Sequence, residues 1–171
     1  MPMKPQNLQR YFGFKLREHA DKSIRLSFGK IVRKEIDSDV FKALLKAQLG
    51  ITHVGIADRK YFYTNKSFWD EVVKEDWIRK IWTKEGWDCD NMAFYFSAEI
   101  SRLFGLTSQP ATYGDFDKGT FHDRHYWNTI LCEDKGALKL YTWEPKNETM
   151  VRAGELVNGA MYSPIKIHLA F

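Results

Sequence analysis

Three residues of this chain have the types and the spacing of a thiol nucleophile system. Cys89 opens a segment with helical periodicity, His125 follows it by 36 positions on a predicted strand, and Glu144 stands another 19 positions on, at the end of the next strand. In such a system a thiolate attacks a carbonyl carbon, an imidazole moves the proton and a carboxylate orients the imidazole. We therefore take Cys89, His125 and Glu144 as the candidate catalytic residues.

Cys89 can act as a nucleophile only if its surroundings favour the thiolate, because a free thiol with a pKa near ~8.5 is mostly protonated at neutral pH. A helix N-terminus and a neighbouring imidazolium both stabilise the anion. Asp88 and Asp90 flank the cysteine and oppose the anion, unless one of them caps the helix. A small buried apolar residue is the alternative interpretation of a single cysteine in a helix.

His125 and Glu144 are predicted to meet through the pairing of two strands. A turn centred between residues 134 and 135 places His125 opposite Glu144, within reach of a hydrogen bond that fixes one tautomer of the ring. An exposed cross-strand ion pair would explain the same two residues but would give no role to Cys89. His122, in the preceding loop, is the competing base.

Further residues are expected to support the site. Trp127 and Trp87 would line the cleft, and Asn128 would lie near His125, three residues along the strand but on its opposite face. The Cys89 backbone N–H would supply half of an oxyanion hole, and the sequence just upstream shows no second donor. The remaining histidines are expected to be structural or exposed: His19, His53 and His168.

Three short stretches carry a resemblance to a known family. They are Cys89-Asp90-Asn91-Met92-Ala93, Arg124-His125-Tyr126-Trp127-Asn128 and Trp143-Glu144-Pro145-Lys146. In order, spacing and predicted context they resemble the Cys-Asp-Asp-Phe-Ala, Gly-His-Ala-x-Asn and Ile-Glu-Pro-Gln motifs of a family of papain-like cysteine peptidases. This family comprises the C-terminal domain of the fairy ring mushroom agglutinin and its short bacterial and phage relatives. The resemblance covers about residues 80 to 150.

The resemblance implies a papain-like α+β fold, in which the helix that carries the cysteine packs on an antiparallel sheet. It implies the same triad, and hydrolysis of a peptide or amide bond through a thioester. It also implies a calcium ion near the triad, bound partly by the glutamine of the Glu-Pro-Gln motif. This chain has Lys146 in that place, which leaves Glu85, Asn147 and Glu148 as the candidate metal ligands.

Two other functions stay open. A cell-wall amidase or peptidase of the NlpC type also opens a helix with Asp-Cys and has a histidine on the next strand, although its Cys-Ser-Gly is absent here. A catalytically silent papain-like fold could serve as a structural or binding protein, for instance in a phage particle. The chain departs from the family motifs at Asn91 and Arg124, where the family has an acidic residue and a glycine.

The elements that must position these residues follow from the hydrophobic pattern. Alternation predicts strands over 23–33, 51–57, 61–63, 126–131, 137–143 and 165–170, and helical spacing predicts helices over 38–49, 65–81 and 90–104. A loop rich in Asp and Gly is expected over 114–119. A helical first half and a sheet-forming second half predict an α+β domain.

Length and composition fit one folded domain, because the chain has 171 residues, of which 44% are hydrophobic. Residues 80–150 would form its catalytic core. Residues 1–36 carry nine Lys or Arg against three Asp or Glu. This basic part could be peripheral and contact an acidic partner or nucleic acid, or it could be a solvated polar face.

The chain shows no apolar run that could span a bilayer and no signal peptide, which predicts a cytoplasmic protein, or one associated with a virion. Its two cysteines, Cys89 and Cys132, are expected to be reduced. The expected partner is a protein or peptide substrate. The sequence itself requires no cofactor, and calcium enters only through the resemblance.

Overall fold

The computed structural model describes residues 17–51, 53–56, 58–75, 89–144, 149–156 and 159–169. The chain divides into two compact units, Met1–Ile31 and Val32–Phe171. In the first unit residues 17–27 are helical, so the strand predicted over 23–33 is wrong. Leu26, which the alternating pattern would bury, is 69% exposed, whereas Ile24 and Phe28, four positions apart, are half-buried. A helical spacing therefore describes this segment better than a spacing of two.

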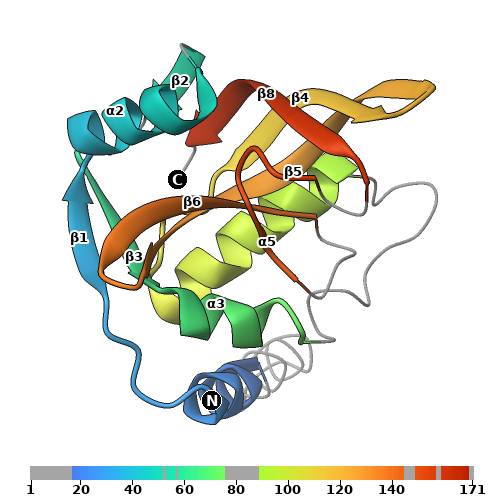
Figure 1. The fold of residues 1–171 in the computed structure, drawn as a ribbon. Coiled ribbons are helices and arrows are strands. Elements are labelled where there is room, and N and C mark those ends of the chain that lie inside the picture. The colour runs from blue at the N-terminus through green and yellow to red at the C-terminus, as the bar shows by residue number, and fades with distance from the viewer. Residues whose placement is uncertain are drawn as a thin grey trace, which may run out of the picture. The chain divides into compact units, whose positions relative to one another are not determined.

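The described part of the second unit contains three helices and a mixed sheet of eight strands, which confirms the α+β class (Figure 1). Its main path runs β1-β3-β5-β4-β8-β2, with β6 paired to β5 and β7 to β6. The pairs β2–β8 and β3–β5 are parallel, so the prediction of an antiparallel sheet is wrong for them. The strands are β1 Lys34–Asp37, β2 His53–Ile56, β3 Lys60–Asn65, β4 Ala111–Lys118, β5 Phe121–Asp134, β6 Ala137–Trp143, β7 Val151–Arg152 and β8 Met161–Leu169.

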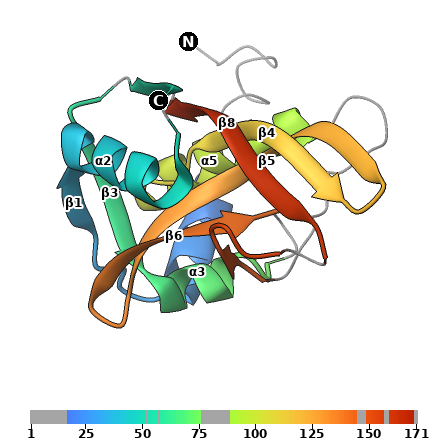
Figure 2. The ribbon, with the colours of Figure 1, turned by 45° about the horizontal axis from the view of Figure 1, so that its top comes forward.

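Strand β4 occupies the segment for which a loop was expected, so that prediction is wrong. It pairs with β5 on one side and with β8 on the other, and Figure 2 shows the three strands side by side. Pairing on both edges outweighs the low strand propensity of Gly and Asp. Asp115 Oδ1 lies 3.1 Å from Arg124 Nη1, so a charge in the middle of the strand is compensated across the ladder.

Strands β5 and β6 form the predicted hairpin around a two-residue turn at Lys135-Gly136. Both turn residues are left-handed, with φ of 53° and 78°, as a type I′ turn requires. The ladder runs from Asp134 opposite Ala137 to Asn128 opposite Trp143. The turn is thus one residue later than predicted, which moves every partner on β6 by two positions. A shift of two keeps each side chain on its expected face.

Two helices begin and end where the sequence predicts. Helix α2, Ser38–Leu49, begins after Asp37 and stops at Gly50, whose φ is 69° and whose N–H donates to the carbonyl of Lys46. Helix α5, Cys89–Phe104, stops at Gly105, whose φ is 64°. No helix in the described residues has the length and apolar character that crossing a membrane would need.

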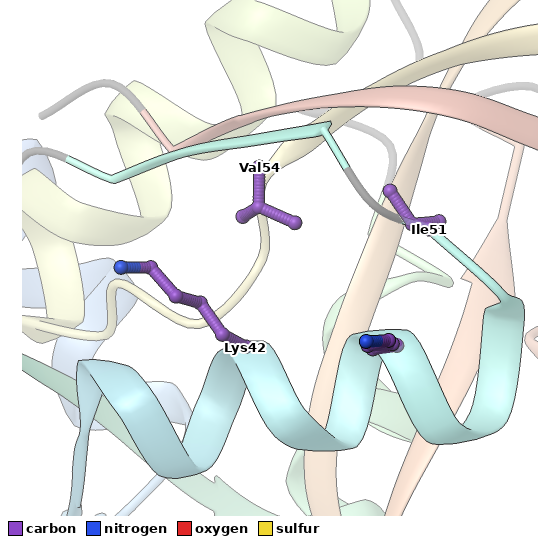
Figure 3. A pocket seen from close by; sticks show the side chains of 4 residues that line it. Lys42, Ile51 and Val54 are labelled. Atoms are coloured by element: carbon purple, nitrogen blue, oxygen red, sulfur yellow. The ribbon is translucent and has the colours of Figure 1, made fainter.

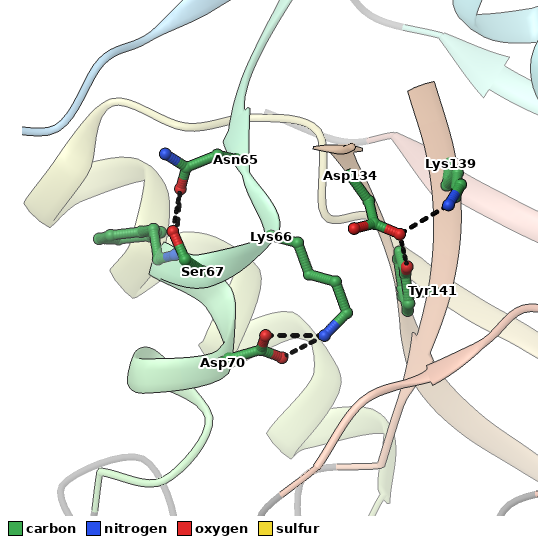
Figure 4. Close-up of polar contacts among 8 residues, drawn as sticks. Asn65, Lys66, Ser67, Asp70, Asp134, Lys139 and Tyr141 are labelled. Carbon is green, nitrogen blue, oxygen red and sulfur yellow. Dashed lines mark hydrogen bonds and ion pairs between the residues drawn. The ribbon is translucent and has the colours of Figure 1, made fainter. Parts of the chain in front are cut away.

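Helix α3, Lys66–Val72, is the described beginning of the predicted helix over 65–81. Asn65 caps it, because its Oδ1 accepts the backbone N–H of Phe68 at 3.1 Å. Figure 4 shows this start of the helix, where the Ser67 hydroxyl also donates a hydrogen bond to Asn65 Oδ1. Residues 76–81 of the predicted helix lie outside the described residues.

The helices of the second unit cover both faces of its sheet. Helix α5 packs on the face of Asn128 and Trp143, where the rings of Phe96 and Trp143 are 4.2 Å apart. Helix α2 covers the opposite face, where Phe41 joins a buried cluster with Leu131. The start of α5 is therefore held against one face of β5, the strand that carries His125.

Candidate active site

Cys89 is the first residue of α5 and is half-buried. The rest of the helix is fixed by its apolar side, which buries residues from Met92 to Phe104. The unpaired N–H groups of a first helical turn favour an anion at this position. Asp90 also uses this turn, because its Oδ1 accepts the backbone N–H of Asn91 at 2.8 Å. The thiol therefore shares the helix start with one carboxylate.

Asn128 joins α5 to β5 and so fixes the helix relative to the strand. Its buried Nδ2 lies 3.0 Å from the Ala93 carbonyl, 2.9 Å from Ser97 Oγ and 3.3 Å from the Gln109 carbonyl. Its side chain lies on the opposite face of β5 from His125, as the alternation of a strand requires. Asn128 thus supports the site by holding the helix, without touching the imidazole.

His125 and Glu144 are in direct contact, with Nε2 2.5 Å from Oε2. The ladder ends with Asn128 opposite Trp143, and one further step of that register would set Glu144 opposite Trp127. The contact with His125 is therefore diagonal. The imidazole is 21% exposed and the carboxylate 9%, so this hydrogen bond is largely shielded from water. It occupies Nε2 and leaves Nδ1 as the ring nitrogen for the thiol.

The pKa of His125 reflects both partners of the ring. Burial lowers this pKa, but hydrogen bonds to Cys89 and Glu144, together with the charges of the two groups, outweigh burial and raise it from 6.5 to about 9. The ring is therefore protonated at neutral pH, and both the thiol and the carboxylate favour its charge. A thiol, an imidazolium and a buried carboxylate in this arrangement can support a thiolate–imidazolium pair.

Aromatic side chains surround the contact between His125 and Glu144. The ring of Phe116 lies 5.5 Å from the imidazole, and the ring of Tyr162 lies 6.1 Å from it. Tyr162 also donates its hydroxyl to Glu144 Oε2 at 3.3 Å. Trp127, 5.0 Å from the Tyr162 ring, is only 1% exposed. It therefore packs beneath Tyr162 and does not line an open cleft, contrary to expectation.

The sequence does not single out Phe116, Tyr162 or Gly114, a glycine at which β4 and β8 approach closely. Gly114 stands opposite His125 in the ladder, and a Cβ atom there would lie 2.2 Å from the Ser163 carbonyl oxygen. No motif marks these residues. One signal was available, namely that Phe116 lies between two aspartates, a pattern typical of a half-buried strand.

The other histidines belong to β5, to β2, to β8 and to the helix of the first unit. His122, the competing base, is on the opposite face of β5 from His125 and has its Nδ1 3.4 Å from Asp117 Oδ1. His19 is exposed in the helix of the first unit, and His53 is exposed on β2. The side chain of His168 is outside the description.

Several predicted site residues lie outside the described residues, and their roles stay predictions: Trp87, Asp88, Glu85, Lys146, Asn147 and Glu148. Within the part of the chain that the structure describes, no three His, Cys, Asp or Glu side chains are grouped so that they could hold a metal ion. Calcium binding thus stays a prediction that depends on the undescribed segments.

A groove of about 380 Å³ between α2 and β2 is separate from these residues (Figure 3). The described side chains that line it are two lysines of α2 and two aliphatic residues, namely Lys42, Lys46, Ile51 and Val54. None of these four belongs to the candidate triad.

Cys132, the second cysteine, is a structural residue. It is buried in β5, and burial raises its pKa to about 12. Nearby, Asp134 accepts hydrogen bonds from Lys139 Nζ at 2.6 Å and from the Tyr141 hydroxyl at 2.8 Å, as Figure 4 shows. A thiol in this setting stays protonated at neutral pH and is unreactive.

No family model matches this chain, and no curated protein is similar to it. The geometry around His125 is therefore the main support for any function.

Proposed function

We propose that this chain is a papain-like cysteine peptidase, or a related hydrolase, which cleaves a peptide or amide bond through a thioester on Cys89. The position of His125 carries the proposal, because its ring hydrogen-bonds to Glu144 and its pKa is raised by both Cys89 and Glu144. The three residues come from the start of a helix, from a strand and from the end of the next strand. The family that the motifs resemble has the same order.

The reaction would start from the Cys89 thiolate and the protonated ring of His125. The sulfur attacks the substrate carbonyl carbon, a C–S bond forms, and an electron pair of the C=O bond moves to the oxygen. The Cys89 backbone N–H is one donor for this oxyanion. As the oxyanion collapses, the C–N bond breaks, and His125 Nδ1 gives its proton to the departing nitrogen. The amine leaves, and a thioester remains on Cys89.

Water completes the cycle. Neutral His125 accepts a proton from the water molecule as its oxygen attacks the thioester carbon. The C–S bond then breaks, which releases the acid and restores the thiolate beside a protonated ring. Throughout both steps Glu144 holds Nε2 and so keeps Nδ1 directed at the sulfur.

A catalytically silent fold with a structural or binding role is the second candidate. Asp90 favours it, because a carboxylate at the same helix start opposes a thiolate on Cys89. The two candidates differ in the chemistry of one sulfur atom. Alkylation and acylation of that atom therefore separate them.

The deciding experiment measures the reaction of iodoacetamide with each cysteine between pH 5 and 9, by mass spectrometry of the digested protein. Cys132 is an internal control, because its raised pKa and burial should keep it unlabelled. We expect Cys89 at pH 6 to react at least about tenfold faster than a free thiol such as glutathione. An equal rate would contradict the proposal.

Acylation tests the next step. With 4-nitrophenyl acetate as a probe we expect one acetyl group per chain on Cys89, followed by turnover, and no acetyl group on the Cys89→Ala variant. Fluorescein-labelled casein then reports peptide-bond cleavage, in calcium and in chelator. A Cys89 that is neither activated nor acylated would favour the silent fold.

A further inference from the structure

Glu144 accepts two hydrogen bonds on one oxygen atom. Oε2 lies 2.5 Å from His125 Nε2 and 3.3 Å from the hydroxyl of Tyr162. We propose that Tyr162 is a positioning residue of the site, which holds the Glu144 carboxylate in the orientation that binds His125. Its effect on turnover rests on the proposed function, whereas its effect on the hydrogen bond between His125 and Glu144 does not.

The place of Tyr162 is fixed by packing. It lies on β8, opposite Phe116 of β4, and both rings share the face of the sheet that carries His125. The ring stands nearly perpendicular to Phe116, at 5.1 Å and 76°, and to Trp127, at 5.0 Å and 78°. Edge-to-face contacts of this kind restrict how the ring can tilt. The hydroxyl is therefore brought to Glu144 by a rigid, buried ring.

The electrostatics make the hydroxyl a donor. Burial, the charge of Glu144 and the hydrogen bond to it all raise the pKa of Tyr162, so the phenol keeps its proton. A carboxylate that is nearly buried needs such donors to stay ionised. With both donors on Oε2, rotation of the carboxylate would break both hydrogen bonds. Tyr162 thus stabilises the orientation in which Nε2 of His125 is bound.

Tyr162 is a positioning residue and not a catalytic one. Its hydroxyl contacts Glu144, and Glu144 in turn contacts the imidazole. Loss of the hydroxyl should therefore leave substrate binding unchanged and reduce the fraction of time in which His125 is correctly oriented. We expect a decrease in kcat of about tenfold with KM unchanged, a loss smaller than that of a triad member.

The test compares Tyr162→Phe with a matched control, Tyr141→Phe. Both substitutions remove a hydroxyl that donates to a carboxylate oxygen, and both keep the ring. Tyr141 of β6 donates to Asp134, the last residue of β5, as Figure 4 shows, and has no contact with His125 among the interactions described. Any effect of general destabilisation should appear in both variants.

The first measurement is NMR of the protein with ¹⁵N-labelled histidine, at neutral pH. The Nε2–H proton of His125 should exchange with water at least about fivefold faster in Tyr162→Phe than in the wild type, because the carboxylate that protects it is free to rotate. Tyr141→Phe should leave this exchange rate unchanged. Equal rates in all three proteins would overturn the proposal.

The second measurement is acylation by 4-nitrophenyl acetate. In the Glu144→Gln background the additional Tyr162→Phe substitution should reduce the rate by less than about twofold, since Tyr162 acts through Glu144. A full additional loss would contradict that coupling. A wild type that is not acylated at all would refute the proposed function, while the exchange rates would still decide the role of Tyr162. If Tyr162→Phe does not fold, 3-fluorotyrosine replaces it, and a stronger donor should then slow the exchange.

Discussion

The side chains of His125 and Glu144 meet diagonally, with Nε2 2.5 Å from Oε2, beyond the last pair of the ladder between β5 and β6, in which Asn128 stands opposite Trp143. Glu144 is therefore positioned by the end of the hairpin and, on its other side, by Tyr162 of β8. Two strands that are distant in sequence thus control one carboxylate.

Glu144→Gln should lower the pKa of His125 from about 9 toward 6.5. The substitution keeps an oxygen that can accept the Nε2 hydrogen bond but removes the negative charge that stabilises the protonated ring. The measurement is the ¹H and ¹³C shift of the His125 ring between pH 5 and 10. Cys89→Ala is the companion variant, because it removes the other hydrogen bond that raises this pKa. A His125 pKa that stays near 9 in Glu144→Gln would show that the carboxylate does not raise it.

Protonation of His125 should also make the stability of the fold depend on pH. The folded pKa, about 9, lies above the ordinary value of 6.5, so the protonated ring contributes its full stabilisation below about pH 6.5 and loses it as pH rises through about 9. The loss should be on the order of 3 kcal/mol at most. Urea unfolding at pH 6 and pH 9.5 measures it.

The control for this pH dependence is His125→Gln, which removes the ring and keeps a polar side chain. The difference in the free energy of unfolding between wild type and variant should be large at pH 6 and small at pH 9.5. A difference that does not change with pH would mean that the ring is neutral in the folded protein at pH 6.

Local signals explain which elements the sequence predicts correctly. Helix α2 is bounded by Asp37 and Gly50, and α5 ends at Gly105, so a cap or a left-handed glycine marks these ends. The hairpin is predicted because the polar stretch Glu133-Asp134-Lys135-Gly136 joins two apolar strands. The strand β4 is missed because its stability comes from β5 and β8, and no residue of the segment itself reports that pairing.

In the candidate site, too, the sequence predicts a local contact and misses one that depends on distant strands. The contact between His125 and Glu144 is predicted from the position of the turn. It forms although the turn lies one residue later than predicted, because a register shift of two residues keeps each side chain on the same face of the sheet. Tyr162 could not be predicted, since β8 reaches Glu144 only through its pairing with β4. Residues that meet across a sheet in this way have no characteristic separation in the sequence.

Asn128→Ala should destabilise the protein by roughly 2 kcal/mol, because it removes a buried donor from the Ala93 and Gln109 carbonyls. Asn128→Asp should cost more, since it places a carboxylate beside those carbonyl oxygens. Both values come from urea unfolding at pH 7. If Asn128 only holds α5 on β5, the pKa of His125 should change little in Asn128→Ala. An unchanged free energy of unfolding in Asn128→Ala would show that the helix does not need this contact.

Gly114→Ala should be among the most damaging single-methyl additions in the sheet. A Cβ at Gly114 would lie 2.2 Å from the Ser163 carbonyl oxygen and 2.7 Å from the ring of Trp127, so backbone and a buried side chain would both have to move. Gly55→Ala is the matched control in strand β2, because its Cβ would meet only the Ile167 carbonyl oxygen, at 3.8 Å.

We expect Gly114→Ala to lower the free energy of unfolding by about 2 to 3 kcal/mol and Gly55→Ala to change it by less than about 1 kcal/mol. Because Gly114 stands opposite His125 and beneath the ring of Trp127, the movement should also reach the imidazole. The His125 ring signals in NMR should therefore shift in Gly114→Ala and stay in place in Gly55→Ala. Equal stabilities of the two variants would mean that β4 and β8 can separate at this point without cost, and that their close approach does not hold Tyr162 against Glu144.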